Sequence, residues 1–508
     1  MSLCWNIRYY DLWHELVGQR YAPERVAIVS LDEATIAAHP SVPLVFWGPS
    51  FARAIDACRT AGARLMVLDF LFSVSPEAWL DTLGVGESEQ ARTYDAAFRS
   101  QLKAGNVLLI GMASRKQSGG FDTLLPLPEY LFSLRNAVED VGLANFAVDS
   151  DNVVRTFSPA FAGEDGLTLG PALGPLAAMR AGLRALPQPP PPTPWLRQET
   201  RAAVYPIRFA GPSQTFPRVS FQRLLEPHAA SDPALRVLDG KIVIFAAEMS
   251  GNQDQHLTPY SRFLTQQRGG LMPGAELHAN IIETLLRGEH LAPLPVFARS
   301  VAVLLLLSVG LFFLQRTSPW GGLGIVVLLA VVWAAGAFLA FRAGRLAPVA
   351  APQAGLLACY LGALGVRLRS EERARRKLRR IFDRYVSPEV VEKILGASQA
   401  PRVEGEMLHV TVLFCDIRNF TTMSEKLHPS EVMELLNRWF ECACDIVQEH
   451  GGMVDKFIGD AIMAVFGAPY RRPDHAQSAI RAALSMAAAS HDVADWCAQR
   501  FAGRGLPL

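Results

Sequence analysis

The sequence has no surplus of either charge and few charged residues of any kind. Lys plus Arg number 49 against 48 Asp plus Glu in 508 residues, which leaves a formal net charge of +1. A protein with this balance has no general attraction for phosphate polymers, so we expect no nucleic-acid partner. Because 50% of the residues are hydrophobic and only 19% are charged, a wholly disordered chain is also excluded.

Cysteine is scarce, and the start of the chain has no apolar run. The 7 cysteines form no C-x-x-C pair, which argues against a disulfide framework and against a structural zinc site. The opening MSLCWNIRYYDLWHELVGQR is too polar for a signal peptide or a membrane anchor. Either a later apolar segment acts as a reverse signal anchor or the chain lacks its true start, and we favour the second interpretation.

Long hydrophobic runs are present in the middle of the chain. A helix of about 20 apolar residues covers the roughly 30 Å of a bilayer core. The third run contains Pro348, Pro352 and Gln353, so we expect it to be kinked and packed against the other two. The alternative, buried helices of a large soluble protein, fits short connecting loops less well. We therefore predict three transmembrane helices within residues 294–366, at Leu294–Leu314, Gly321–Phe341 and Leu346–Val366.

A basic segment after the third run predicts the orientation. Eight Lys or Arg lie between Arg367 and Arg380, against two Glu. Such segments stay on the cytoplasmic side, so we expect a multi-pass plasma-membrane protein whose C-terminal domain is cytoplasmic and whose residues 1–293 lie outside. Arg342 and Arg345, in the loop before the third run, oppose this orientation mildly.

Residues 1–293 have the pattern of an α/β domain. The segment PSFARAIDACRTAGA reads as a helix that starts near Pro49 and stops near Gly62, between two predicted strands, which gives a βαβ unit. The run QPPPPTP from Gln188 reads as an exposed polyproline spacer. Four short runs are hydrophobic enough for strands buried on both faces: VAIVSLD from Val26, LMVLDFLF from Leu65, VLLIGM from Val107 and KIVIFAAE from Lys241.

Several loosely defined motifs in this region together resemble a known sensor. In order along the chain they are DEATIAA from Asp32, VGLANFAVDSDNVVR from Val141, IRFAGPSQTF from Ile207 and MPGAELHANIIETLLRGEHL from Met272. Residues 10–290 thus resemble the CHASE2 extracytoplasmic sensor domain, which implies an extracytoplasmic ligand of unknown identity. Where that family has a WPWPR-like stretch, this chain has FWGPS from Phe46.

Four polar residues of the sensor region could bind a ligand or a metal. They are Asp32, Asp69, Asp254 and His278. Acidic residues at strand ends more often cap helices and accept hydrogen bonds from backbone amides. We therefore favour structural roles for these residues.

The segment 367–404 is predicted to be a helical linker. An apolar stripe at Leu378, Ile381, Phe382 and Tyr385 has helical spacing, and SPEVVEKIL from Ser387 reads as a second short helix. The linker is either a solvated helix beside the membrane or a parallel dimer stalk that carries motion from sensor to output.

Two carboxylates are predicted to meet after Met407. HVTVLFCDIRNFT has a strand that ends at Asp416, and MVDKFIGDAIMAVFG reads as a hairpin folded about Gly459 and Asp460. Between them, HPSEVMELLNRWFECACDIVQEHGG is a strongly amphipathic helix. Two converging carboxylates repel each other unless a divalent cation lies between them, and oxygen ligands favour Mg²⁺ or Mn²⁺.

FCDIRNFT and DKFIGDAIMAVFG together resemble the class III nucleotide cyclase catalytic domain over residues 405–508. The resemblance implies an α+β ferredoxin-like domain that acts as a homodimer with two metal ions. It implies that Asp416 and Asp460 bind the metals and are catalytic, and that Ile417 offers a carbonyl to a metal. The implied substrate contacts are phosphate at the amides of Asn419, Phe420, Thr421 and Thr422, and adenine at Lys456.

The reaction implied is attack of the ribose 3′-oxygen of ATP on the α-phosphorus, which yields cyclic AMP and pyrophosphate. No counterpart of the family's second purine contact, or of its transition-state asparagine and arginine, can be found after Arg500. We therefore expect an incomplete cyclase domain, in an inactive fragment of a receptor adenylate cyclase truncated at both ends. The alternatives are a guanylate cyclase or a non-catalytic sensor or dimerisation module; a diguanylate cyclase lacks support because no GG[DE]EF-like motif occurs.

Overall fold

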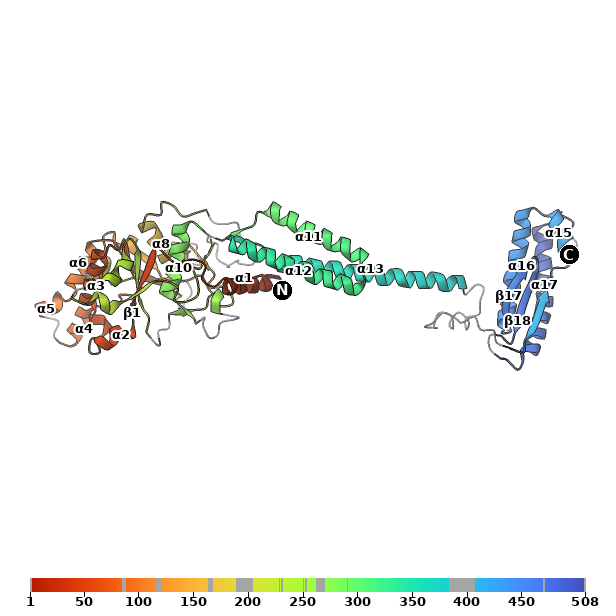
Figure 1. Ribbon diagram of the computed structural model, residues 1–508, viewed down its shortest axis with the longest axis horizontal. Coiled ribbons are helices and arrows are strands. Elements are labelled where there is room, and N and C mark those ends of the chain that lie inside the picture. Colours follow the sequence, from red (N-terminus) through yellow and green to blue (C-terminus); the bar gives the residue numbers. More distant parts are fainter. Residues whose placement is uncertain are drawn as a thin grey trace. The chain divides into compact units, whose positions relative to one another are not determined.

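The computed structural model describes residues 2–84, 88–115, 121–162, 168–188, 204–227, 229, 232–249, 251, 254–261, 270–289, 291–382, 407–468 and 471–506. The chain divides into two compact units, Met1–Ala363 and Leu364–Leu508, which we describe separately (Figure 1). The predicted polyproline run from residue 189 onward and the predicted helix 387–395 lie outside the described residues.

A mainly parallel β-sheet forms the centre of the first unit. Its strands lie in the order β10-β1-β11-β2-β3-β4, with β5 beside β3, and β3–β4 is an antiparallel pair. The four predicted strands are confirmed as β1, β2, β3 and β11. The strand bounds are β1 Val26–Leu31, β2 Leu65–Leu68, β3 Val107–Arg115, β4 Phe121–Leu124, β5 Val141–Leu143, β10 Arg218–Ser220 and β11 Ile242–Ala247.

Helices cover both faces of this sheet, so β1 and β2 are buried at every position. On one face α3 (Gly48–Thr60) and α6 (Ala96–Lys103) pack in a large apolar core. On the other, α8 (Leu173–Arg180) and α10 (Gly274–Arg287) pack in a second core. The predicted helix between β1 and β2 is confirmed as α3, with Gly62 at a φ of +86° just after its end.

Short elements complete this part of the chain. They are α2 Glu33–Ala38, η1 Leu44–Phe46, α4 Pro76–Thr82, α5 Glu89–Arg92, α7 Pro128–Leu131, η2 Ala137–Asp140, β6 Thr156–Phe157, β7 Ala160–Ala162, β8 Thr168–Pro171, β9 Tyr205–Pro206, α9 Phe221–Leu224, η4 Pro233–Leu238, β12 Gln255–His256, η5 Pro259–Ser261 and β13 Met272–Pro273.

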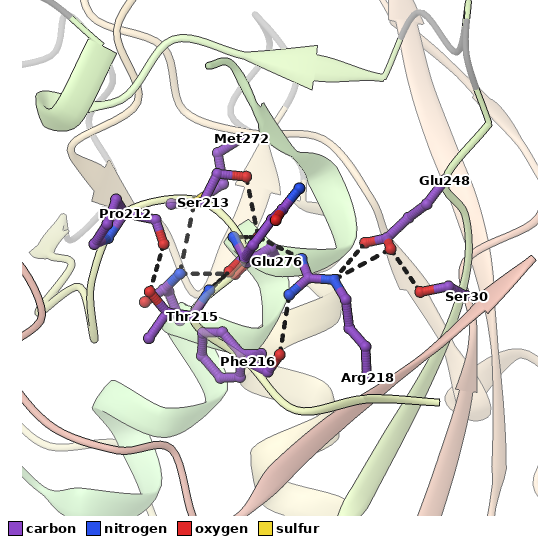
Figure 2. A network of polar contacts seen from close by, with 11 residues as sticks. Ser30, Pro212, Ser213, Thr215, Phe216, Arg218, Glu248, Met272 and Glu276 are labelled. Atoms are coloured by element: carbon purple, nitrogen blue, oxygen red, sulfur yellow. Dashed lines mark hydrogen bonds and ion pairs between the residues drawn. The ribbon is translucent and has the colours of Figure 1, made fainter. Parts of the chain in front are cut away.

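A buried ion network fixes the start of α10 against the sheet (Figure 2). The guanidinium of Arg218 lies between two carboxylates, 2.6 Å from Glu276 and 3.1 Å from Glu248. Glu276 is fully buried and also accepts hydrogen bonds from the backbone of Gln214 and Thr215, each at 2.9 Å. Because each charge has partners, the network orients α10 without leaving a buried ion unpaired.

The first helix, α1 (Ser2–Val17), is held by the folded sensor region. Asp11 receives two hydrogen bonds from Arg155, at 2.7 and 2.8 Å, and both side chains are fully buried. Arg155 also pairs with Asp149 and Asp151. The side-chain oxygen of Asn6 accepts hydrogen bonds from the backbone of residues 349 and 350, where α13 begins. The helix α1 therefore joins the sensor region to the start of α13.

Among the residues that the structure describes, two helices are long and apolar enough to cross a membrane, α11 (Val296–Arg316) and α12 (Pro319–Arg342). The third predicted span is not among them. Residues 345–346 belong to a short strand, β15, which pairs with β14 (Ala292–Pro293), and α13 (Ala350–Phe382) starts after them. Only 350–366 is then both helical and uncharged; this stretch is at the lower limit of length for a membrane span, and Pro352 and Gln353 make it less apolar than α11 and α12.

The first turns of α13 nevertheless pack against α11 and α12. Leu356 is fully buried in a cluster with Leu306 and Val326. The indole of Trp333 donates to the carbonyl of Pro348 at 2.9 Å, and Gln353 donates to the carbonyl of Ala330 at 3.4 Å. The expected packing of the third run against the other two is thus confirmed, although its span is not.

The second unit contains an antiparallel sheet in the order β16-β18-β17. Two long helices pack on one face of this sheet through an apolar core. The predicted amphipathic helix and the predicted hairpin are both confirmed, as α16 and as β17–β18. The elements are β16 Thr411–Cys415, α15 Phe420–Lys426, α16 Pro429–Glu449, β17 Met453–Ile458, β18 Ala461–Phe466 and α17 His475–Arg500.

Candidate functional site

The antiparallel sheet brings the two predicted carboxylates together. Asp416 follows the last residue of β16, and Cys415 pairs in register with Ile462 of β18. Asp460 lies in the two-residue turn between β17 and β18, where Gly459 has a φ of +68° that suits this tight hairpin. Strand register and turn length thus place Asp416 beside Asp460, as the sequence predicted.

The environment of Asp460 shows how close the two side chains are. Burial and a hydrogen bond shared with the Asp416 side chain raise the pKa of Asp460, and backbone N–H groups of Asp460 and Ile417 oppose this rise. Asp416 itself is exposed and accepts a hydrogen bond from the N–H of Ile417 at 3.1 Å. Two carboxylates in contact hold a proton or a cation between them, so this pair suits a divalent metal ion.

The described residues contain no group of three or more His, Cys, Asp or Glu side chains that could hold a metal. Further ligands would have to be backbone, water or substrate oxygens, which is usual for Mg²⁺. The carbonyl of Ile417 accepts a hydrogen bond from the N–H of Phe420 at 3.3 Å and keeps a second lone pair for another partner.

The turn that is predicted to bind phosphate follows Asp416 in the chain. Asn419 has a φ of +57° and precedes α15, whose first turn includes Phe420, Thr421 and Thr422. The N–H of Phe420 is already bonded to Ile417. The N–H groups of Thr421 and Thr422 lie in the first turn of the helix, where intrahelical acceptors are missing.

Lys456 lies on β17, in register with Met463 of β18, which in turn pairs with Phe414 of β16. The Lys456 side chain is 60% exposed and contacts the Asp455 carboxylate at 3.2 Å. A register shift between residues 454 and 456 interrupts the alternation of β17 at this point, which the sequence pattern did not predict. Lys456 and the carboxylate pair therefore belong to the same three-stranded sheet.

The face of this sheet away from the helices is open and apolar. Val412 is 41% exposed, Phe414 62% and Ile458 51%. On the opposite face Ile462, Ala464 and Phe466 are fully buried against α16 and α17. An exposed apolar sheet face next to a polar site is typical of a surface that another protein surface covers.

The four polar residues that could bind a ligand in the sensor region have different surroundings in the structure. Asp32 caps α2 by accepting from the N–H of Thr35 at 2.9 Å, which confirms the structural role for this residue. Asp254 accepts a hydrogen bond from His256 at 2.8 Å. Desolvation, and after it the charge of Asp254, raises the pKa of the Asp69 carboxyl to about 7. His278 is buried beside Phe146, with 4.4 Å between the ring centroids. Sequence patterns did not single out His256 or Phe146, because only the tertiary fold brings them to His278.

Two family models match the chain, and they cover different parts of it. The CHASE2 domain model matches residues 2–314, and the adenylate and guanylate cyclase catalytic domain model matches residues 403–501. The molecule is thus a sensor domain joined to a nucleotide cyclase domain. The chain belongs to the CHASE2 domain family, and the suspected domain architecture is confirmed.

Curated relatives match about a quarter of the chain. An adenylate cyclase of Anabaena cylindrica is 35% identical over 127 residues, 25% of this chain and 23% of its own length. An uncharacterized Mycobacterium tuberculosis protein is 37% identical over 115 residues, 23% of this chain and 21% of its own. The chain spans about a fifth of the length of these curated relatives.

Two solved structures are also similar to this chain. The adenylyl cyclase CyaB from P. aeruginosa is 30% identical, with a TM-score of 0.19, over 20% of this chain and 52% of that one. The guanylyl cyclase Cya2 is 36% identical, with a TM-score of 0.18, over 19% and 49%.

Proposed function

We propose that this protein is a membrane-bound receptor adenylate cyclase, in which an extracytoplasmic sensor controls the conversion of ATP to cyclic AMP and pyrophosphate. The observation that carries the proposal is the contact between Asp416 and Asp460 within a domain of the cyclase family. The apolar helices α11 and α12 support membrane attachment, and the basic segment from Arg367 supports a cytoplasmic cyclase domain. Two crossings alone would leave the sensor region on that same side, so an extracytoplasmic sensor requires one further crossing, by the uncharged start of α13 that packs against both helices.

In the proposed reaction the 3′-oxygen of the ribose forms a bond to the α-phosphorus while the bond to the leaving pyrophosphate breaks and the 3′-hydroxyl loses its proton. Asp416, Asp460 and the Ile417 carbonyl would hold two Mg²⁺ or Mn²⁺ ions. When bound, these ions supply charge stabilisation to the alkoxide and the triphosphate. The amides of Asn419, Thr421 and Thr422 would orient the phosphates, and that of Phe420 would do so on leaving the Ile417 carbonyl.

Preference for ATP over GTP is part of the proposal and depends on Lys456. An ammonium group donates to a ring nitrogen that accepts in adenine, whereas the corresponding nitrogen of guanine carries a proton. Lys456 is exposed on the open sheet face, where a nucleotide can reach it. Replacing Lys456 by Ala should reduce the preference for ATP over GTP by about 3- to 10-fold, because one hydrogen bond to adenine is lost. Equal affinities in the unaltered chain would contradict the assignment.

The open sheet face supports a homodimer. Val412, Phe414 and Ile458 expose apolar area next to the carboxylate pair, and a second copy of the domain would cover it. A site that lies on this face would then be shared between two copies. This arrangement agrees with the dimeric site that the family resemblance implies.

Metal and nucleotide binding by the purified chain tests the site without relying on turnover. Bound Mn²⁺ can be counted by electron paramagnetic resonance, and Mn·ATP binding can be followed with a fluorescent ATP analogue. Changing Asp416 or Asp460 to Asn should weaken both by at least about tenfold, because one carboxylate is lost from a site with only two. The control is Asp445→Asn, an exposed acid on α16, which should bind as the unaltered chain does. Unchanged binding in both site variants would refute the proposed metal site.

Sidedness is a separate test of the receptor proposal. A reporter fused after residue 508 that fluoresces only in the cytoplasm should be bright, because the basic segment from Arg367 holds that side of the chain inside. A reporter active only after export, in the same position, should be silent. The reverse result would place the cyclase domain outside and end the proposal.

A further inference from the structure

The helix α1 contacts both the end of α12 and the start of α13, and we call this contact region the joint. The Trp13 ring of α1 lies 5.6 Å from the ring of Phe341, near the end of α12. The Asn6 side chain accepts hydrogen bonds from the N–H groups of Val349 and Ala350, each at 2.9 Å. Phe341 is completely buried, so removal of apolar area from water favours the docked joint.

One charged group in the joint has no counter-ion. The guanidinium of Arg20 lies over the Phe341 ring, 4.4 Å from its centroid. All three of its nitrogen atoms are shielded from solvent and have no hydrogen-bond partner among the described residues. Burial lowers the pKa of Arg20. The groups that act on this pKa next most strongly are aromatic hydroxyls and another arginine, and not carboxylates: Tyr260, Tyr10, Arg208 and Tyr21.

The other buried arginine that contacts α1 is paired. Arg155 donates hydrogen bonds to the carboxylates of Asp11, Asp149 and Asp151. Such partners offset much of the cost of taking a charge out of water. Arg20 has only the π-face of an aromatic ring in their place, which compensates a cation less completely. The burial of Arg20 therefore opposes docking of the joint.

A second polar group in the joint is also incompletely paired. His14 of α1 is completely buried, and its Nδ1 lies 2.9 Å from the carbonyl oxygen of Tyr10. Its Nε2 has no partner among the residues that the structure describes. The His14 ring lies 4.8 Å from that of Phe341, so both groups lie against the same side chain of α12. Withdrawal of Phe341 would let water reach them and would remove the cost of burying them.

Docking of the joint is thus a balance between apolar burial, which favours it, and two uncompensated polar groups, which oppose it. We propose that the joint is a conformational switch, in which the unpaired Arg20 keeps the docked state only slightly favoured, so that the end of α12 and the start of α13 can separate from α1. The ion pair of Asp11 with Arg155 holds α1 on the sensor region in both states.

Separation would release the first turn of α13, the helix that runs from Ala350 to Phe382 toward the cyclase region. A switch requires an element with two arrangements of similar free energy, and the joint has this property because opposing contributions meet in it. The use of the switch to carry a signal to the cyclase rests on the proposed receptor function. The separation itself does not.

Hydrogen exchange of the full chain in detergent, followed by mass spectrometry, measures the docked state. The amides of Val349 and Ala350 have Asn6 as their acceptor and, at the start of a helix, no intrahelical one. Arg20→Met removes the charge and keeps an unbranched apolar side chain, so it should slow exchange of these amides at least about tenfold. Arg20→Lys keeps the charge and should not slow it. Unchanged or faster exchange in Arg20→Met would overturn the proposal.

Arg287→Met is the matched control. Arg287 also lies over an aromatic ring, 4.2 Å from the centroid of Tyr21, but it is ion-paired with Glu289 at 3.6 Å. This variant should leave exchange at residues 349 and 350 unchanged, and slowing equal to that of Arg20→Met would overturn the role of the missing counter-ion. If Arg20→Met does not fold, the neutral Arg20→Gln against Arg20→Lys decides by the same criterion. Exchange in β1 and β11 should stay the same in every variant, and none of these results depends on cyclase activity.

Discussion

The two sheets of this protein bury their side chains in different ways. In the sensor region β1 and β2 are buried at every residue, because helices cover both faces of a parallel sheet. In the cyclase region β18 alternates between buried and partly exposed residues, because helices cover only one face. The first sheet completes its core within one chain. The second leaves apolar surface exposed, and the carboxylates of the proposed metal site lie at the margin of that surface.

A matched pair of substitutions gives the largest expected contrast. Val243→Asp puts a charge in β11, where Val243 is fully buried, and should prevent folding of the sensor region because an unpaired buried charge costs several kcal/mol. Val412→Asp puts the same charge on the open face of β16 and should leave the cyclase region folded. Circular dichroism and limited proteolysis measure the first effect.

The effect of Val412→Asp is measured through self-association of the chain. Sedimentation of the Val412→Asp chain should show weaker self-association than the unaltered chain. If Val412→Asp unfolds its domain as Val243→Asp does, the second sheet is not open and the comparison fails.

The buried ion cluster of the sensor region should produce the next largest effect. Arg155 is fully buried among Asp11, Asp149 and Asp151. Arg155→Met leaves these carboxylates without their cation and should lower the free energy of unfolding by about 3–5 kcal/mol. Arg500→Met, at an exposed ion pair with Glu434, should change the free energy of unfolding little, because water and salt screen that pair. Chemical denaturation followed by intrinsic fluorescence distinguishes the two, and equal costs would contradict the difference in burial.

Asp69 gives a pH-dependent prediction. Its folded-state pKa is raised by desolvation, and then by Asp254, to about 7, above the ordinary value of 3.8. The contribution of such a carboxyl to the free energy of unfolding is fully present below its unfolded-state pKa. This contribution is lost as the pH rises through the folded-state pKa of about 7. Asp69→Asn should therefore stabilise the sensor region by roughly 2–4 kcal/mol at pH 8 and by little at pH 4. Thermal unfolding at both pH values checks this, and a gain of equal size at pH 4 would exclude titration of Asp69 as the cause.

Two glycines at positive φ give the smallest contrast. Gly459 turns the cyclase hairpin with open space around its Cα, so Gly459→Ala should cost only about 1 kcal/mol of backbone strain. A Cβ at Gly62, in the sensor region, would lie 2.2 Å from a carboxylate oxygen of Asp239. Gly62→Ala should cost more, because Asp239 must also move. Melting temperatures of the two variants test this order.

Local patterns predicted the strands and the carboxylate pair because each depends on neighbouring residues. The apolar runs at Val26 and Lys241 became β1 and β11, and the hairpin at Gly459 placed Asp460 as expected. Where a helix begins can depend on more distant contacts. The first residues of the third apolar run form β15 and not helix, because residues 345–346 pair with a strand more than 50 residues earlier. The surroundings of His278 were beyond prediction for the same reason, since Phe146 and Asp254 come from other segments of the chain.

The contact between Asn6 and the start of α13 has a consequence for the order in which the protein is built. Asn6 is synthesised long before its partners, because the N–H groups that it accepts from are those of Val349 and Ala350, 343 and 344 residues later. At about 5–20 residues per second, roughly 20–70 s pass before its partners leave the ribosome. The hydrogen bonds from Val349 and Ala350 to Asn6 therefore form only after the intervening domain has been synthesised. The docking of α1 against the start of α13 is for this reason a late step, which follows the synthesis of the whole sensor region.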